Sequence, residues 1–592
     1  METQSLLVRL CIEVACESGE NVEIWRRQKR SLERLPSPLA DALIRRLLSR
    51  RLLYPSLLEN FKYSAEEIDV KGENSVDAEW MAYLGAFRHL RYLNVADCRR
   101  INSSALWAMT GMTTLQELNL SRCVKVNDAG IKHLISIANL EKLHIAETGV
   151  TAEGVKLLSS LNNLSVLDLG GLPVNDMALS SLQVLKKLRY LDLWGSKISN
   201  RGAAAFNMFP KLSYLNLAWT SVTKLPNLSS LECLNMTNCT IDSVLEDEDN
   251  EAPLTKLIFS GATFRNEAET LSSLNAIFLS FLDVSHSSLS RFCFLSNMKV
   301  MEHLNLSSCV MGDDSVEMVA CIGRNLKSLN FSGTRVSSSG VGILVGHVPN
   351  LEILSLSQTL VDDAAIAYIS MMPSLRVVDL SNTIIKGFIQ QIGTDLESRL
   401  SLTALQNLKY LERLNLEHTQ IQDEALSPLS TLQELRYLSL RSASLADLSF
   451  HYLSSIPNLI DLSVCDAVVT NYGLELFKPP ATLKMMDLRG CWLLTKDAIL
   501  SFCGSHPQIE ARHELGTTFP LDQNRPDRGS PSRLTSRTVQ VTKKNANTSI
   551  SPCFLDQRLK YSIDELLALE SLSLHLPSNH ETWNTMFKKQ SG

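Results

Sequence analysis

The segment LQELNLSRCVKVNDAGIKHLISIANL, Leu115 to Leu140, contains the pattern that decides the fold. Its opening LQELNL alternates apolar and polar side chains over L-x-L, which is typical of a strand with one buried face. The stretch from Val126 to Ala138 begins with polar residues and then spaces its apolar residues as a helix does. The segment therefore predicts one unit of strand, turn and helix.

The same L-x-x-L-x-L opening recurs along the chain, mostly at intervals of 24 or 25 residues. A degenerate first unit begins at Ala65, and the others begin at Leu90, Leu115, Leu140, Leu164, Leu188, Leu212, Leu231, Leu254, Leu279, Met301, Leu326, Leu351, Leu375, Leu411, Leu435, Leu459 and Leu483. This period lies in the range of leucine-rich repeats, whose units stack because one unit cannot bury its own apolar face. We predict an α/β leucine-rich repeat solenoid, a horseshoe of about 18 repeats with a concave parallel sheet and helices outside.

Acidic residues stand where several of the predicted helices begin. Asp128, Asp362 and Asp423 each precede a stretch with helical apolar spacing. A carboxylate there accepts hydrogen bonds from free N–H groups and lies at the positive end of the helix. We expect these residues to be N-caps or first-turn acids.

Eight residues after the first leucine, most units carry a small side chain. It is Cys98, Cys123, Cys239, Cys309 or Cys491 in some units, and Thr148, Thr220, Thr334, Thr359, Thr383 or Thr419 in others. This pattern predicts a small buried site at the turn, with structural, reduced thiols, and it favours the cytoplasm or the nucleus. From about Ala65 to Arg512 the chain resembles the cysteine-containing, ribonuclease-inhibitor-like leucine-rich repeats of F-box receptors.

Composition excludes several other classes of protein. The 592 residues are 45% hydrophobic and 20% charged, as in a folded soluble protein, and the net charge of -6 gives no reason to expect nucleic acid. No stretch approaches the roughly 18 apolar residues of a membrane span, so we expect no membrane partner. Glu2, Arg9 and Glu13 interrupt the apolar start, unlike a secretory signal, so we expect that segment to be retained.

No catalytic motif stands out in the chain. It has no G-x-x-x-x-G-K-[ST], H-E-x-x-H, G-x-S-x-G or C-x-x-C, and its twelve histidines follow no metal-ligand spacing. We therefore expect neither an enzyme nor a cofactor or metal. The expected activity is recognition of a protein substrate on the concave face.

Strand alternation points residues two, four and six after the first leucine away from the core. This rule places Tyr190, Asp192, Trp194 and Tyr214 in an exposed aromatic patch beside Asp168, a favoured kind of partner anchor. A second candidate substrate-binding patch is basic and comprises Arg413, Arg441 and Arg489, with Tyr437 and Glu417 beside them. Concave residues without any ligand remain the alternative for both patches.

The opening SLLVRLCIEVA, Ser5 to Ala15, predicts a short apolar helix. Leu7, Cys11 and Ala15 follow one another at intervals of four and fall on one stripe of it. They match the L-x-x-x-C-x-x-x-Φ pattern of a BC-box, the helix that inserts into elongin C. The alternative is a cap over the open end of the solenoid, which terminal repeats need.

The next segment, LPSPLADALIRRLL, matches a second docking motif. Leu35, Pro36, Leu39 and Leu43 fit the Φ-P-x-x-Φ-x-x-x-Φ of the cullin-binding box in von Hippel–Lindau-type receptors. Proline suits the start of a helix, where its missing N–H is not needed. The same residues match the LPxxL opening of an F-box, so an elongin C-like and a Skp-like adaptor both remain open.

A BC-box, then an L-P box, then leucine-rich repeats is the order found in zyg-eleven-like receptors, which the chain resembles over roughly its first 510 residues. The resemblance implies a non-catalytic substrate-recognition subunit of a cullin-RING ubiquitin ligase, bound to an adaptor and a cullin. The chain lacks the long helical-repeat domain of those receptors, so their substrates do not carry over. The alternatives are a cytosolic signalling or immune scaffold and, third, a secreted receptor.

We expect four regions. Residues 1–60 form the adaptor-binding helices, 61–513 the solenoid, 514–555 a disordered basic Ser/Pro-rich linker, and 556–592 a tail with a short helix. Two insertions interrupt the repeats. The acidic Leu245–Pro253 predicts a solvated loop, and the long step from Leu375 to Leu411 predicts a longer helix or a protruding loop.

Overall fold

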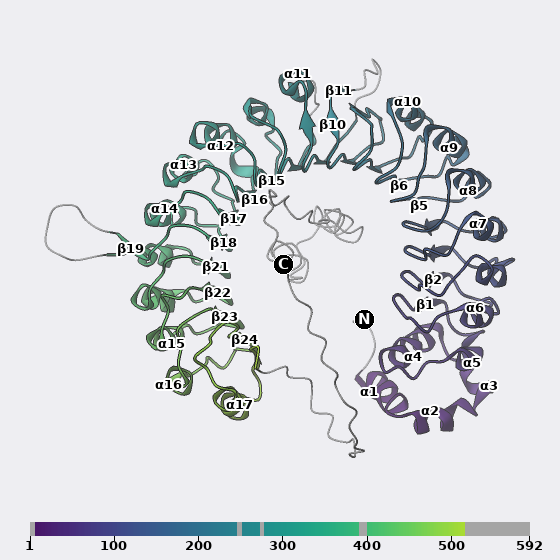
Figure 1. The fold of residues 1–592 in the computed structure, drawn as a ribbon, viewed down its shortest axis with the longest axis horizontal. Helices are drawn as coiled ribbons and strands as arrows, with labels where there is room; N and C mark the ends of the chain where they lie inside the picture. The colour runs from purple at the N-terminus through teal and green to yellow at the C-terminus, as the bar shows by residue number, and fades with distance from the viewer. Residues whose placement is uncertain (1–5, 245–251, 273–276, 390–398, 516–592) are drawn as a thin grey trace, which may run out of the picture. The chain divides into compact units, whose positions relative to one another are not determined.

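The structure is a computed structural model that describes residues 6–244, 252–272, 277–389 and 399–515. The strands of successive repeats form one parallel sheet of nineteen strands, which lines the inner side of an arc (Figure 1). Each strand pairs in register with the strand of the next repeat, as Leu93 does with Leu118 and Leu118 with Leu143. The predicted α/β leucine-rich repeat solenoid is confirmed.

Each of the predicted repeat starts leads into a strand, and β25 follows the last of them. The strands of the sheet are β1 (Glu67–Asp69), β2 (Tyr92–Asn94), β3 (Glu117–Asn119), β4 (Lys142–His144), β5 (Val166–Asp168), β6 (Tyr190–Asp192), β7 (Tyr214–Asn216), β9 (Cys233–Asn235), β12 (Lys256–Ile258), β14 (Phe281–Asp283), β15 (His303–Asn305), β16 (Ser328–Asn330), β17 (Ile353–Ser355), β18 (Val377–Asp379), β21 (Arg413–Glu417), β22 (Tyr437–Arg441), β23 (Asp461–Cys465), β24 (Met485–Asp487) and β25 (Glu510–Arg512).

Short helices form the outer side of the arc (Figure 1). The α-helices are α6 (Ala78–Leu84), α7 (Asp128–Leu134), α8 (Ala152–Leu157), α9 (Asp176–Ser181), α10 (Asn200–Ala203), α11 (Glu267–Ser272), α12 (Val316–Ala320), α13 (Ser338–Leu344), α14 (Asp363–Ile369), α15 (Asp447–Leu453), α16 (Asn471–Leu476) and α17 (Lys496–Ser505). The 3₁₀ helices are η2 (Ala105–Met109), η3 (Leu158–Ser160), η4 (Leu182–Val184), η5 (Ala204–Met208), η6 (Cys293–Asn297), η7 (Asp313–Ser315), η8 (Gly323–Asn325), η9 (Ser401–Asn407) and η10 (Asp423–Thr431).

The acidic residues expected at helix starts lie there. Asp362 is the N-cap of α14 and accepts the N–H of Ala364 at 3.0 Å. Asp128 and Asp423 stand in the first turns of α7 and η10. These side chains satisfy or face N–H groups that have no partner inside the helix.

Most strands of the main sheet lead into a turn of one kind. The residue four after the first leucine is usually Asp or Asn, and its side chain accepts the N–H two residues on, as Asn94 does from Ala96 at 3.1 Å. In most repeats the residue seven after the first leucine has a left-handed backbone, with φ of 61° at Asp97 and 59° at Trp219. A bulky residue rarely adopts that conformation, so the repeat geometry imposes the turn on Trp219.

The small residues at position eight are hydrogen-bonded, and all but Thr148 and Thr220, which are half-buried, are buried. A cysteine donates its thiol to the preceding repeat, as Cys123 Sγ does to the Val95 carbonyl at 3.2 Å, whereas Thr334 Oγ1 donates to Phe331 in its own repeat at 2.6 Å. Burial raises the pKa of the Cys123 thiol to about 12. The prediction of buried structural thiols is confirmed, and each cysteine in the described ranges is free.

A second set of hydrogen bonds joins the helix starts of neighbouring repeats. Asp176, in the first turn of α9, accepts the N–H of Ser199 at 2.9 Å and its hydroxyl at 2.7 Å, and Ser199 is the N-cap of α10. Three residues after that N-cap stands Gly202, where a Cβ atom would overlap Asp176 Oδ1. The same trio recurs as Asp128, Thr151 and Gly154, as Asp313, Ser337 and Gly340, and as Asp447, Thr470 and Gly473.

The N-terminal helices pack onto the first repeat. They are α1 (Leu6–Ala15), α2 (Gly19–Arg26), α3 (Lys29–Leu32), α4 (Ser37–Ser49), α5 (Pro55–Leu58) and η1 (Glu59–Phe61). Leu47 and Phe61 are fully buried in a core that continues into the repeats. Asp41 of α4 accepts the N–H groups of Glu66 and Glu67 at 3.1 and 3.2 Å. These helices are the expected helical cap, because α4 satisfies N–H groups at the start of the sheet.

Within the long step from Leu375 to Leu411, β19 (Phe388–Ile389) pairs antiparallel with β20 (Arg399–Leu400), and η9 follows. Residues 390–398, on which the prediction of a longer helix or a protruding loop falls, lie outside the described residues. Two parallel pairs lie outside the main sheet, β8 (Lys224–Leu225) with β11 (Ser243–Val244) and β10 (Thr240–Ile241) with β13 (Thr263–Phe264). The acidic stretch at 245–251, most of the linker at 514–555 and the tail at 556–592 lie outside the described residues.

Replacing Gly202 with alanine should destabilise the solenoid, although alanine favours helices. The new Cβ would displace Asp176 and remove its two bonds to Ser199, at a cost of about 1–3 kcal/mol. Urea unfolding followed by circular dichroism measures the shift in midpoint.

Gly504→Ala in α17 is the matched control, since no atom lies within 4 Å of its Cβ position. It should leave the midpoint unchanged or raise it slightly. Equal effects of the two substitutions would contradict the role assigned to Asp176.

Candidate functional site

One face of α1 is apolar and exposed. Leu7 is 71% exposed, and Leu10, Cys11 and Val14 are exposed as well. Residues at these intervals share one side of a helix, so together they form a continuous stripe. We call these four residues the α1 face. The structure thus leaves Leu7 and Cys11, two of the predicted adaptor-binding residues, accessible.

The rest of α1 is attached to the body of the protein. Glu13 forms ion pairs with Arg46 and, at 3.0 Å, with Arg50 of the α4 region, and these arginines lower its pKa. Trp25 Nε1 donates to the Ala15 carbonyl at 2.9 Å. Ala15 itself packs against the core, so the prediction that it shares an accessible stripe with Leu7 and Cys11 is wrong. The anchored side fixes which residues α1 presents.

The L-P box residues are largely used by the fold. Pro36 is exposed and precedes α4 as its N-cap residue, as expected for a proline at a helix start. Leu35 is half-buried against the core, and Leu39 is half-buried too. Leu43 is only 8% exposed, because that side of α4 packs in the core with Leu47. Leu43 is therefore not accessible to a cullin in this conformation.

On the concave face, the central aromatic residues lie together but differ from expectation. The rings of Tyr190 and Tyr214 stack with centroids 4.1 Å apart and planes 5° apart. Tyr190 is 5% and Tyr214 9% exposed, while Trp194 and Asp192 are half-buried. The predicted exposure of both tyrosines is wrong, because paired strands bring their side chains close enough for each ring to cover the other.

Two carboxylates lie beside these rings. Asp168 and Asp192 are directly paired on β5 and β6. Asp192 accepts the N–H of Trp194 at 2.8 Å and the Asn216 amide at 2.9 Å, whereas His144 Nδ1 lies 3.6 Å from Asp168 Oδ2. Burial, followed by the charge of Asp168, raises the pKa of Asp192 to about 7. We call Asp168, Tyr190, Asp192, Trp194 and Tyr214 the central cluster.

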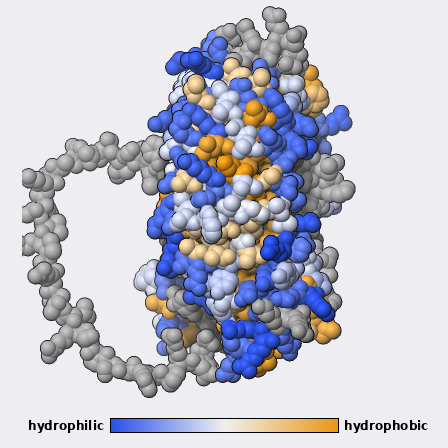
Figure 2. All heavy atoms as spheres, turned by 90° about the vertical axis from the view of Figure 1, so that its right-hand side faces the viewer, coloured by the Kyte–Doolittle hydropathy of each residue, from blue (hydrophilic) through white to orange (hydrophobic). Residues whose placement is uncertain are grey.

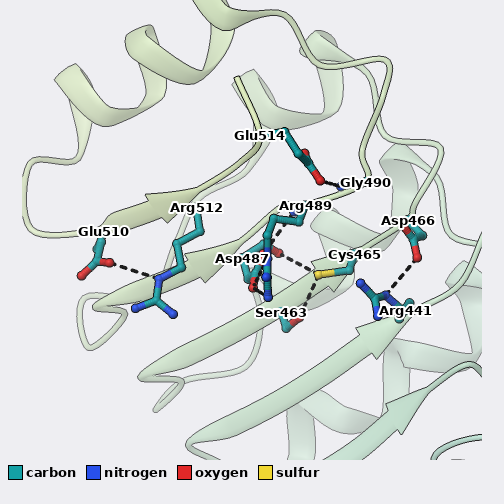
Figure 3. A network of polar contacts seen from close by, with 10 residues as sticks. All are labelled: Arg441, Ser463, Cys465, Asp466, Asp487, Arg489, Gly490, Glu510, Arg512 and Glu514. Carbon is teal, nitrogen blue, oxygen red and sulfur yellow. Dashed lines mark hydrogen bonds and ion pairs between the residues drawn. The ribbon is translucent and has the colours of Figure 1, made fainter. Parts of the chain in front are cut away.

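The arginines of the predicted basic patch are mostly paired with acids (Figure 3). Arg489 contacts Asp487 through Nε and Nη2, the latter at 2.6 Å, and Arg441 Nε lies 2.9 Å from Asp466. Arg413 lies over the ring of Tyr437, 4.2 Å from its centroid. Burial alone would raise the pKa of Asp487, but its bonds to Arg489 outweigh burial and lower it.

In the last repeats, too, charged side chains have nearby partners. Arg512 Nε donates to Glu510 at 3.1 Å, and Glu514 accepts the N–H of Gly490 at 2.8 Å (Figure 3). The expectation of a positive surface around Arg441 and Arg489 is wrong, since neighbouring acids neutralise both. The sequence does contain a sign of one pair, because Asp487 ends β24 and Arg489 follows only two residues later.

The outer side of the N-terminal half of the arc offers a mixed surface. Figure 2 shows hydrophilic and hydrophobic residues interspersed on this side of the molecule. Exposed apolar residues such as Trp107 and Met177 are scattered over it, which is normal for a protein surface. This face therefore offers less basis for a binding site than the α1 face and the central cluster.

Within the described part of the chain, no group of three or more His, Cys, Asp or Glu side chains is arranged to hold a metal ion. None of the helices described there is long and apolar enough to cross a bilayer. On the concave face, Asp192 and Asp379 each accept a backbone N–H of their own turn.

The chain matches known leucine-rich repeat families. A family model described as a leucine-rich repeat region matches residues 149–400, and a second leucine-rich repeat model matches residues 111–134 and 407–430. These matches lie on the repeats described above. They cover strands from both the N-terminal and the C-terminal half of the sheet.

Several solved structures are similar to the chain. An internalin from Listeria monocytogenes strain 4b F2365 is 18% identical over 67% of this chain and 94% of its own, with a TM-score of 0.38. A leucine-rich repeat protein from Leptospira interrogans is 15% identical over 78% of this chain and 99% of its own, at 0.41. TLR13 in complex with ssRNA13 is 18% identical over 77% and 73%, at 0.42. At this identity the likeness concerns the fold alone.

Asp192 and Asp487 should affect stability with opposite pH dependence. The raised pKa of Asp192 means that the folded state holds its proton more tightly than the unfolded state, so this group's contribution falls as pH rises from about 4 to 7. Asp192→Asn should therefore raise Tm relative to wild type by about 1–2 °C at pH 8, and by less at pH 5.

Asp487, whose pKa is lowered, contributes stability that is present at neutral pH and lost on acidification. Asp487→Asn should lower Tm at pH 8, with the deficit shrinking toward pH 3. Thermal unfolding across this range checks both variants. Differences from wild type that do not change with pH would contradict these assignments.

Proposed function

We propose that this chain, whose repeats form a leucine-rich repeat solenoid, is the non-catalytic substrate-recognition subunit of a cullin-RING ubiquitin ligase. In this proposal the α1 face binds an elongin C-like or Skp-like adaptor, and the concave face holds a protein substrate. Ubiquitin transfer would then be accelerated by proximity on a shared scaffold, without any bond-making residue in this chain.

The observation that carries the proposal is the α1 face. A helix that served only as a cap would turn its apolar residues toward the solenoid, whereas Leu7, Leu10, Cys11 and Val14 point outward from an anchored helix. Apolar anchors at intervals of three and four are what a helix uses in a partner's groove. Two of these four exposed residues, Leu7 and Cys11, are the ones that match the BC-box pattern.

Substrate binding on the concave face rests on its shape and side chains. The parallel sheet presents one extended row of side chains per strand position, and the central cluster adds aromatic rings and carboxylates to it. Aromatic residues are enriched where partners bind most strongly. In the proposal, the concave face of the solenoid therefore binds the substrate, and the α1 face binds the adaptor.

The packing of α4 supports a second candidate function, that of an interaction scaffold. Leu43 and Leu47 pack in the core, and Asp41 satisfies the first strand, so α4 serves the solenoid itself. If the whole N-terminal region has only this role, the protein is a cytosolic interaction scaffold without an adaptor.

A pull-down of the tagged full-length chain distinguishes the two functions. Wild type should retain an adaptor and a cullin, and Leu7→Asp combined with Cys11→Asp should reduce both by about tenfold or more, because charged groups would be buried in the adaptor groove. Circular dichroism should show that the double variant stays folded, since both side chains are exposed.

Ile24→Asp is the matched control, because Ile24 is also exposed in the N-terminal helices but lies on α2. It should leave retention unchanged. Failure of wild type to bring down any adaptor or cullin would exclude the ligase function and leave the scaffold.

A further inference from the structure

The central cluster contains a buried tyrosine hydroxyl. Tyr190 is 5% exposed, and its hydroxyl interacts with Asp192 and Tyr214 but forms no hydrogen bond of regular geometry with any described residue. A buried hydroxyl whose hydrogen bonds are incomplete is one to which a ligand can offer a better partner. Its surroundings are negative, since the Asp192 and Asp168 charges contribute to raising the pKa of Tyr190 after burial and Tyr214.

The two carboxylates lie close together with no side chain between them. A Cβ atom built on Gly170 would meet Asp168 Oδ1 at 3.3 Å and Asp192 Oδ1 at 3.4 Å. The glycine therefore leaves both oxygens near one point of the concave face. Asp192 as a residue is half-buried, so the cluster is not closed off from solvent.

Aromatic rings form the walls of the cluster. Tyr190 and Tyr214 are stacked nearly parallel, and the Trp194 ring covers Gly171, where a Cβ atom would come within 2.8 Å of Cζ3. Planar rings beside carboxylates attract a flat cation, which stacks on the rings and donates to the oxygens.

Neither strand that flanks β6 and β7 places a cationic side chain opposite the two tyrosines. The residues paired with Tyr190 and Tyr214 in the neighbouring strands are Val166 and Cys233. The Asp168 carboxylate faces His144 at 3.6 Å, but Asp192 faces the neutral amide of Asn216. A positive group from outside would relieve the repulsion between the two carboxylates, which contributes to the high pKa of Asp192.

Elsewhere on the concave face, an arginine of the chain itself stacks on a tyrosine. It stands two residues after the first leucine of its repeat, as Tyr190 and Tyr214 do in theirs. Arg413 of β21 lies over the ring of Tyr437 on the adjacent strand β22, with Asp461 next in the row. The arrangement of arginine on tyrosine beside aspartate is thus one that this sheet accommodates.

We infer that the central cluster binds an arginine side chain of a protein ligand. The guanidinium would stack on the aromatic walls and donate to Asp192 and to the Tyr190 hydroxyl. Lysine suits the cluster less well, because its ammonium is compact and strongly hydrated and does not stack as a plane. The inference rests on the part of the proposed function that assigns protein binding to the concave face, and it does not depend on the adaptor.

Fluorescence anisotropy with the full-length protein tests this inference. The probes are three fluorescein-labelled, end-blocked peptides of one sequence that carry arginine, lysine or citrulline at a central position. The arginine peptide should bind about tenfold more tightly than the citrulline peptide, and several-fold more tightly than the lysine peptide. Equal binding of arginine and citrulline, or of arginine and lysine, would overturn the assignment.

The variants locate the site. Asp192→Asn keeps the turn, since Asn94 fills the same role in its repeat, and should weaken arginine binding about tenfold. Tyr190→Phe removes only the hydroxyl and should weaken binding about threefold. Asp379→Asn is the matched control, because Asp379 accepts the N–H of Ser381 at 3.0 Å in the same turn of another repeat. It should change binding less than twofold, and a loss equal to that of Asp192→Asn would overturn the inference.

The adaptor pull-down separates this inference from the proposed ligase function. Asp192→Asn should retain adaptor and cullin as wild type does, because the central cluster is remote in sequence from α1. Peptide binding without any adaptor would leave the inference standing and exclude the ligase. Adaptor binding without any preference for the arginine peptide would exclude the inference and leave the proposed ligase function standing.

Discussion

The hydrogen bonds that each repeat makes to its neighbour are the constraint on which the rest of the structure depends. The backbone ladder, the Cys123 thiol on the Val95 carbonyl and the Asp176 carboxylate on Ser199 all join one repeat to the next. Each donor is satisfied only when the adjacent unit is in place, so the repeats fold as a stack. Both candidate surfaces are therefore presented by one continuous body rather than by separate modules.

Much of this body follows from local sequence. The spacing of leucines predicts the strands and their order, and small residues at position eight predict the buried thiols, because strand and turn geometry repeat in every unit. The link from Asp176 to Gly202 was not predicted, since it depends on a contact between repeats. The tyrosines were misjudged for the same reason: alternation gives the side of the sheet but not whether a neighbouring ring covers it.

The candidate sites show the same limit. The helical stripe of α1 was readable from the positions of Leu7 and Cys11, but the inward turn of Ala15 depends on how α1 packs against the body. The sequence places Arg441 in a positive patch, but Asp466, from the next repeat, lies beside it and pairs with it. What remains after these pairings is an exposed apolar helix face and a negative aromatic cluster, two surfaces of different chemistry.

The central claim is that α1 is a docking surface and more than a cap. Hydrogen–deuterium exchange of the full-length protein, with and without a purified elongin C-like adaptor in complex with its cullin, tests it most directly. Slower exchange on binding within residues 6–15, with the strands from β5 to β7 unchanged, is the predicted result. Unchanged exchange in α1 at saturating concentrations of an elongin C-like and of a Skp-like adaptor complex would contradict the claim.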